Sequence, residues 1–123
     1  MATVLGILGF ASFAEAGNNF IKYDTTVGKF NGNGYSNTQT KVVDGQKAEM
    51  SHTSNGGYNV DVRTDFDITD GDGTTGPWAR DVKAGDSRKL TNGHNAGNKV
   101  RLHFSNDITT RVDTQAKGSW ASN

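Results

Sequence analysis

The clearest pattern in the chain is an alternation of apolar and polar residues between Tyr58 and Ile68. Polar residues fill every second position, and between them lie Tyr58, Val60, Val62, Thr64, Phe66 and Ile68. Successive side chains of an extended chain point to opposite faces of a sheet. The pattern predicts one long strand with an apolar face in the core and a polar face in water.

The last part of the chain carries two more alternations of the same kind. In the first, one face is shared by Val100, Leu102 and Phe104. In the second, one face is shared by Ile108, Thr110, Val112, Thr114 and Ala116. Because only Ser105-Asn106-Asp107 separates the two runs, we expect them to pair as a hairpin.

A second hairpin is expected around Asp44-Gly45. The flanking segments 38–43 and 46–52 are candidate strands, and an Asp-Gly pair favours the type I′ turn that joins two antiparallel strands tightly. Other turn signals, such as Asn55-Gly56-Gly57, divide the rest of the chain into short segments. No segment shows the period of an amphipathic helix.

These elements together predict an all-β fold of about seven strands. Polar faces on the clearly patterned strands are typical of antiparallel sheets, since the strands of buried parallel sheets lack them. We expect an antiparallel β-sandwich, with a small β-barrel as the alternative. The apolar faces of the three alternating runs would form its centre, with Trp78 and Trp120 as lids.

The first sixteen residues differ from the rest of the chain. Apolar side chains fill most of the run from Ala2 to Ala14, which is shorter than the roughly 20 residues that a membrane-spanning helix needs. Ala14-Glu15-Ala16 has the small-x-small form of a cleavage site, although no basic residue precedes the run. We expect a secretory signal peptide at 1–16, a single β domain at 17–123 and a secreted protein without a membrane span. The alternative is an apolar N-terminal segment that packs in the core or inserts into a neighbouring subunit.

The composition narrows the possible partners. The sequence has 123 residues, enough for one modest core but not for two. Lys+Arg and Asp+Glu number 13 each, and this balance gives no electrostatic reason to expect nucleic acid as a partner. The absence of cysteine excludes disulfides, thiol catalysis and cysteine-ligated metals.

One acidic loop is a candidate calcium site. Asp67, Asp70 and Asp72 lie close together in a glycine-containing stretch, and Ca²⁺ takes several oxygen ligands from flexible loops. The spacing does not match an EF-hand, which would place Ile68 and Ala79 where carboxylates are required. The loop therefore predicts either a looser calcium site or an ordinary exposed turn, and we expect no other cofactor.

Catalytic motifs are missing from the sequence. There is no Gly-x-Ser-x-Gly stretch, and no metal-ligand spacing links His52, His94 and His103. We interpret His94 and His103 as surface residues. Asp61 and Asp65 flank Arg63 on one strand face, and cross-strand ion pairs with Arg101 or Arg111 explain them better than a catalytic pair of carboxylates. We expect a protein that is not an enzyme.

Two aromatic residues lie outside the alternating runs and are candidates for ligand contact. Tyr35 belongs to an Asn- and Gly-rich segment, and Trp78 follows Pro77, the only proline. Small β-sandwiches hold sugars through exposed aromatic rings that stand beside planar polar side chains. Tyr35 and Trp78 therefore predict a binding surface for glycan or for a cell surface.

Four short segments carry a resemblance to a known group: GNNFIKY, NGYSNTQTK, NKVRLHF and the late GSW. With the export-like start, their order resembles the small exported proteins of Gram-positive bacteria that carry domains of unknown function. The resemblance implies secretion and a compact β-domain, and it brings no activity with it. We expect a secreted, non-enzymatic binding module for glycan or cell surface. The alternatives are a structural or self-associating surface protein that uses an apolar N-terminal strand, and an exported antimicrobial or inhibitor.

Overall fold

The protein folds into β-strands joined by turns and loops. The computed structural model describes residues 20–69 and 72–123, so the predicted signal peptide at 1–16 lies outside the described residues. No helix that could span a membrane occurs within these two ranges. Nine strands are present in them: β1 (Ile21–Val27), β2 (Asn33–Tyr35), β3 (Gln39–Thr40), β4 (Ala48–Ser54), β5 (Val60–Phe66), β6 (Ala79–Val82), β7 (Ser87–Leu90), β8 (Lys99–Asn106) and β9 (Thr114–Ala121).

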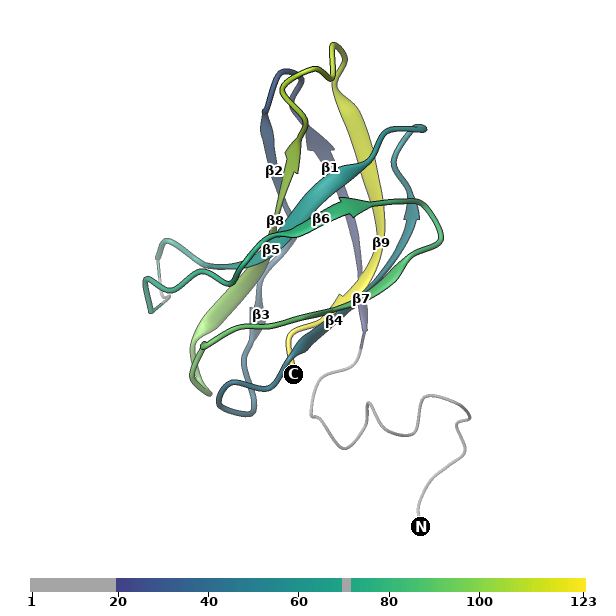
Figure 1. Cartoon of the computed structure of the whole chain (residues 1–123). Helices are drawn as coiled ribbons and strands as arrows, with labels where there is room; N and C mark the ends of the chain where they lie inside the picture. The colour runs from purple at the N-terminus through teal and green to yellow at the C-terminus, as the bar shows by residue number, and fades with distance from the viewer. Residues whose placement is uncertain (1–19, 70–71) are drawn as a thin grey trace.

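The strands form two antiparallel sheets with the core between them (Figure 1). One sheet has the order β1-β9-β4-β7, and the other has the order β2-β8-β5-β6, with β3 also pairing to β8. Both sheets contribute to the core, for example through Met50 and Trp120 from the first and Val62 and Phe104 from the second. The prediction of an all-β antiparallel sandwich is confirmed, with nine described strands rather than about seven. The sheets do not close into a barrel.

The alternating pattern places the core correctly in β5 and β8. Most inward positions of the two strands are buried, and Phe66 at the end of β5 is partly exposed. The fully buried ones are Val60, Val62, Thr64, Leu102 and Phe104. Tyr58 and Ile68 lie just beyond the ends of β5 and are exposed, so the predicted strand is too long at both ends.

The last alternating run is only partly correct. β9 begins at Thr114, and its residues Ala116 and Trp120 are fully buried. Ile108 and Val112 are exposed in the loop that precedes β9, because the chain there is passing from one sheet to the other. Trp120 is a core residue and not a lid, since no part of its side chain reaches the solvent.

Both predicted hairpins are wrong, because the chain crosses between the sheets at each of them. Residues 105 and 106 continue β8, and the chain then leaves for β9 in the other sheet. At Asp44-Gly45 a turn does form, closed by the Gln46 amide donating to the Val43 carbonyl at 3.2 Å. Of the pair, only Gly45 has a positive φ, whereas a type I′ turn needs it at both positions. This turn instead links β3 in one sheet to β4 in the other.

Two buried amide side chains tie the sheets together. Asn106 of β8 donates from Nδ2 to the carbonyl of Val27 in β1, at 2.9 Å. Gln39 of β3 donates to the Trp120 carbonyl and accepts from the Ser122 amide, each at 2.8 Å. A buried polar group that loses its partner costs about 1–3 kcal/mol. These bonds therefore help to fix how one sheet lies on the other.

An aromatic side chain crosses β9 at a glycine. Tyr23 of β1 pairs with Gly118 of β9, which pairs in turn with His52 of β4. The Tyr23 hydroxyl reaches Nδ1 of His52 at 2.8 Å. A Cβ added at Gly118 would overlap both this hydroxyl and the Ser51 carbonyl. Glycine is required here because the tyrosine passes directly over the strand.

Lys41 is buried without a carboxylate partner among the described residues. Its ammonium group donates to the carbonyl oxygens of Gln46 and, at 2.8 Å, Ser122. Burial lowers the pKa of Lys41 to about 8. Burial also lowers the pKa of His52 and raises the pKa of Tyr23. Each of these groups therefore has a different pKa in the folded and in the unfolded chain, so the free energy of unfolding depends on pH.

Replacing Gly118 with alanine is expected to lower the free energy of unfolding by about 1–3 kcal/mol or more, the usual cost of extra atoms in a packed site. Gly93→Ala is the matched control, since nothing lies within 4 Å of a Cβ added there and the backbone of Gly93 has no positive φ. Urea unfolding measures both variants. Equal stability of the two would contradict the passage of Tyr23 over β9.

We expect the free energy of unfolding to rise by about 2 kcal/mol between about pH 8 and pH 10. The pKa of Lys41 is about 8 in the folded chain and near its ordinary value of 10.5 in the unfolded chain, so the unfolded chain binds more protons in this interval. Above about pH 10 the trend reverses, because the folded chain holds the Tyr23 proton that the unfolded chain loses. Below about pH 6.5 stability falls, because the unfolded chain protonates His52 more readily.

Urea unfolding across this range measures the effect, and Lys41→Met should remove the rise between about pH 8 and pH 10. A rise of the same size in Lys41→Met would show that a different group is responsible.

Candidate functional site

The two aromatic residues singled out in the sequence meet on one face of the β2-β8-β5-β6 sheet. Tyr35 of β2 is directly opposite His103 of β8, and His103 is directly opposite Arg63 of β5. Trp78 immediately precedes β6, the next strand of this sheet. The neighbours of His103 along β8 are core residues, so these side chains lie on the other face, away from the core. We call this surface the outer face and define it by Tyr35, Arg63, Trp78, Arg101 and His103.

The rings of the outer face contact one another around His103. The His103 ring centroid lies 4.7 Å from that of Tyr35, with the rings close to parallel, and 5.0 Å from that of Trp78, with a tilt of 57°. The guanidinium of Arg101 lies 3.9 Å from the Tyr35 centroid, and that of Arg63 lies 4.5 Å from the Trp78 centroid. Each cation–π contact contributes about 0.5–1 kcal/mol at an exposed site. Together they hold the rings in a preformed arrangement.

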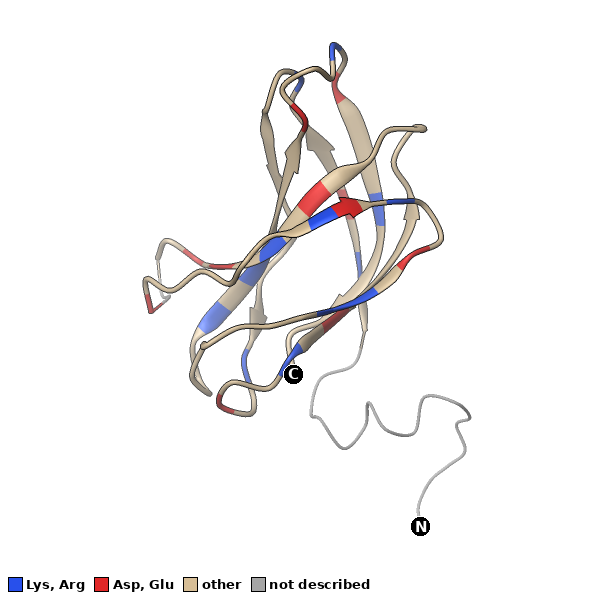
Figure 2. Ribbon diagram, viewed as in Figure 1, with Lys and Arg blue, Asp and Glu red and all other residues tan. Residues whose placement is uncertain are grey.

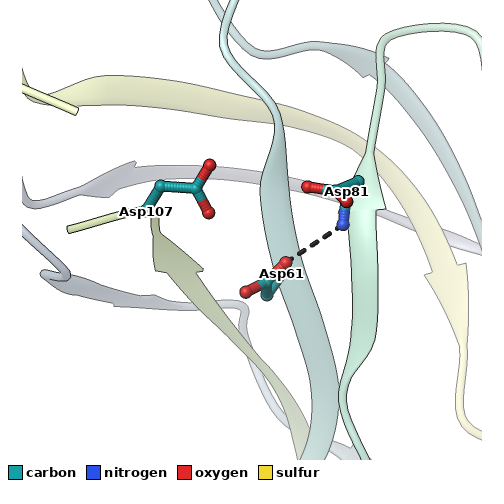
Figure 3. Close-up of side chains that lie close together, drawn as sticks. All are labelled: Asp61, Asp81 and Asp107. Atoms are coloured by element: carbon teal, nitrogen blue, oxygen red, sulfur yellow. Dashed lines mark hydrogen bonds between the residues drawn. The ribbon is translucent and has the colours of Figure 1, made fainter. Parts of the chain in front are cut away.

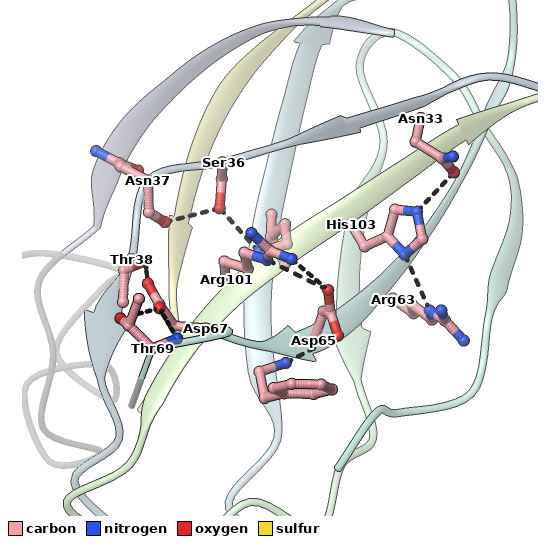
Figure 4. A network of polar contacts seen from close by, with 12 residues as sticks. Asn33, Ser36, Asn37, Thr38, Arg63, Asp65, Asp67, Thr69, Arg101 and His103 are labelled. Atoms are coloured by element: carbon pink, nitrogen blue, oxygen red, sulfur yellow. Dashed lines mark hydrogen bonds and ion pairs between the residues drawn. The ribbon is translucent and has the colours of Figure 1, made fainter. Parts of the chain in front are cut away.

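Hydrogen bonds fix the orientation and the protonation of His103 (Figure 4). Nε of Arg63 can only donate, so Nδ1 of His103, 3.2 Å away, is the acceptor. Nε2 of His103 lies 2.7 Å from Oδ1 of Asn33 and therefore carries the proton. Burial lowers the pKa of His103, and the positive charges of Arg63 and Arg101 lower it further against the opposing charge of Asp65. His103 is thus a neutral ring at pH 7.

Two arginines of this sheet are neutralised by carboxylates. Arg101 donates through Nε and Nη2 to Oδ2 of Asp65, each at 3.2 Å, as the cross-strand charge pattern predicts. Asp61 pairs with Arg80 at 2.7 Å and not with either arginine predicted for it. Figure 2 shows these basic and acidic segments on the neighbouring strands β8, β5 and β6. Asp61 and Asp65 are only 7% and 6% exposed, so the predicted wet face is largely covered by its own side chains.

Three carboxylates gather beside the outer face. Asp61, Asp81 and Asp107 place oxygen atoms within 4.8 Å of one another (Figure 3). Asp61 also accepts a hydrogen bond from the Asp81 amide at 3.0 Å, where the backbone of Asp81 has a φ of 54°. Asp81 and Asp107 are exposed and have no basic partner among the described ion pairs. Asp81 and Asp107 therefore add negative charge beside the outer face.

Two of the three carboxylates predicted to bind calcium, Asp67 and Asp72, have protein partners. Asp67 accepts from the hydroxyl and the amide of Thr69, at 2.6 and 2.8 Å, and hydrogen bonds from Thr69 above all lower the pKa of Asp67 to about 2. Asp72 lies 3.3 Å from Nδ1 of His94. Asp70 lies outside the described residues. The calcium site at these three residues therefore stays a prediction.

Sequence reasoning identifies the rings of the outer face but not its central residue. The expectation that His94 and His103 are surface residues is wrong, since His94 is fully buried and His103 is only 7% exposed. The alternation along β8 does place Arg101 and His103 on one face. Nothing local in the sequence shows that Tyr35 lies opposite His103, because that contact depends on the pairing of distant strands.

The comparisons with known proteins provide no relative for this chain. No family model, no curated protein and no solved structure matches it. The candidate site is therefore defined by the residues and distances of the outer face.

Proposed function

We propose that this protein is a non-enzymatic binding module that holds glycan on its outer face. The observation that carries the proposal is the meeting of Tyr35 and Trp78 at His103, from parts of the chain that are far apart in sequence. Secretion belongs to the same proposal and is supported by the apolar start of the chain at 1–16.

The chemistry of the outer face suits sugars. A pyranose ring presents C–H groups on its two sides and hydroxyl groups around its rim. Tyr35 is 39% exposed and Trp78 is partly exposed, so aromatic surface is available for the C–H groups. The planar polar groups of Asn33 and Arg63 stand beside these rings and can form hydrogen bonds with hydroxyl groups.

The hydrogen bonds of the outer face favour binding over catalysis. Both ring nitrogens of His103 have partners, and Asp65 is paired with Arg101. A general base must reach the proton that it removes, and these groups are already engaged with one another. The same contacts hold the side chains in place before a ligand arrives, which lowers the entropic cost of binding.

Trp78→Ala is expected to weaken glycan binding by about tenfold or more, because central aromatic residues dominate the affinity of binding surfaces. An array of neutral and acidic oligosaccharides identifies a ligand, and calorimetry then measures its affinity for each variant. Tyr58→Ala is the matched control, since Tyr58 is a 42% exposed aromatic residue that takes no part in the ring contacts of the outer face.

Thermal unfolding should show that both variants fold, and Trp78→Phe should restore most of the binding. The proposal is wrong if the unaltered protein binds no glycan on the array. It is also wrong if Tyr58→Ala weakens binding as much as Trp78→Ala does.

A second candidate function, self-association, is favoured by an apolar tip of the sandwich. Here the loop after β1 meets the loop after β8, joined by the Phe30 amide donating to the Thr110 carbonyl at 2.8 Å. Three apolar side chains of this tip are exposed to solvent: Phe30 (56%), Ile108 (72%) and Val112 (45%). Phe30 also has a φ of 54°, a conformation that costs about 1–2 kcal/mol in a residue with a Cβ. An apolar tip held in this way suits contact with a second copy of the chain.

The double variant Phe30→Ser, Ile108→Ser is expected to lose any concentration-dependent association seen in sedimentation velocity, because it removes the exposed apolar surface of the tip. Val42→Ser, Val43→Ser is the matched control, since these two valines are exposed elsewhere on the molecule. A monomer at all concentrations in the unaltered protein would exclude this second function. The apolar N-terminal strand predicted for the same role lies outside the described residues.

A further inference from the structure

Arg63 differs from the other arginines of its sheet in having no carboxylate partner within the part of the chain that the structure describes. Arg101 is paired with Asp65, and Arg80 is paired with Asp61. Within residues 20–69 and 72–123, Arg63 takes part in no ion pair, and its one hydrogen bond uses Nε. The two terminal nitrogens of its guanidinium group are therefore available to a ligand.

The position of Arg63 is fixed by contacts that leave these terminal nitrogens unused. Nε donates to Nδ1 of His103, and the guanidinium lies 4.5 Å from the centre of the Trp78 ring. Figure 4 shows the terminal nitrogens directed away from the imidazole. Arginine presents parallel N–H groups that match the two oxygens of a carboxylate. A carboxylate bound there would lie beside an aromatic ring that can cover the sugar carrying it.

His103 is the positioning residue for this arrangement. Its neutral ring offers a lone pair at Nδ1 to Arg63, because Asn33 holds the proton on Nε2. A histidine carries a donor at both nitrogens once it is protonated, and it would then repel the guanidinium. The arginine is thus held in place by a neutral partner, and no carboxylate of the described residues forms an ion pair with it.

The neighbouring acidic cluster limits how much negative charge a ligand can carry. Asp81 and Asp107 are exposed and lie close to Asp61, only two positions from Arg63 on β5. A polymer with a carboxylate on every sugar would bring like charges against this cluster, which disfavours binding. One negative charge on a ligand can meet Arg63, whereas further charges along the ligand would approach the acidic cluster.

We infer that the outer face selects oligosaccharides that carry a single carboxylate, such as one uronic acid among neutral sugars, and that Arg63 binds this carboxylate. The inference rests on the proposed glycan-binding function and names the ligand class for the same site.

The experiment uses the full chain on an array that holds neutral oligosaccharides and oligosaccharides with one uronic acid, before and after chemical reduction of the carboxyl groups to alcohols. We expect the singly acidic members to bind about tenfold more tightly than their reduced counterparts. In Arg63→Gln the acidic members and their reduced counterparts should bind equally, and Arg63→Lys should retain part of the difference. Arg111→Gln is the matched control and should keep the full difference, since Arg111 is an exposed arginine in the loop before β9. Polygalacturonate should compete poorly.

The outcomes separate the two proposals. Equal binding before and after reduction, with binding still lost in Trp78→Ala, would overturn the acidic ligand class and leave glycan binding in place. A preference for the acidic members that survives Arg63→Gln in a folded variant would overturn the role of Arg63. Failure of the unaltered protein to bind any member would overturn glycan binding itself, and the acidic ligand class with it.

Discussion

The register of β8 between β2 and β5 is the constraint on which both the core and the outer face depend. On one side of β8, Leu102 and Phe104 are fully buried between the sheets. On the other side, Arg101 and His103 form the middle of the outer face. A slip of one residue would exchange the two sides, so the burial of apolar side chains fixes where His103 lies. Strand pairing then places Tyr35 and Arg63 opposite His103. The burial of apolar side chains in this way determines the position of a polar site.

The outer face uses its arginines in two different ways, and the difference depends on His103. Arg101 is neutralised by Asp65 while it lies over Tyr35, so it stabilises the ring without adding charge to the surface. Arg63 is held by a neutral imidazole, because burial and the nearby guanidinium groups keep the pKa of His103 low. Of the three arginines on the strands of this sheet, Arg63 is therefore the one without an ion-pair partner among the described residues.

The sequence predicts the strands better than it predicts their partners. Alternation in 58–68 and 100–104 identifies core positions, because the buried face of each strand carries apolar side chains whichever strand it pairs with. Turn chemistry at Asp44-Gly45 correctly predicts a turn, but it does not say that the strands on its two sides belong to different sheets. Among the described strands, β5 and β6 are the only consecutive pair that hydrogen-bond to each other. Tyr35 and Trp78 are recognisable as candidates from sequence, whereas their common contact with His103 depends on pairings between distant segments.

The measurement that tests the central claim most directly is NMR chemical-shift mapping of the backbone amides and the Trp78 indole during titration with a glycan that binds on the array. Binding at the outer face predicts that the largest changes fall on Tyr35, Arg63, Trp78 and His103. Changes confined to the tip around Phe30, or to the shallow depression lined by Gly45, Gln46, Lys47, Glu49 and Lys89, would contradict it.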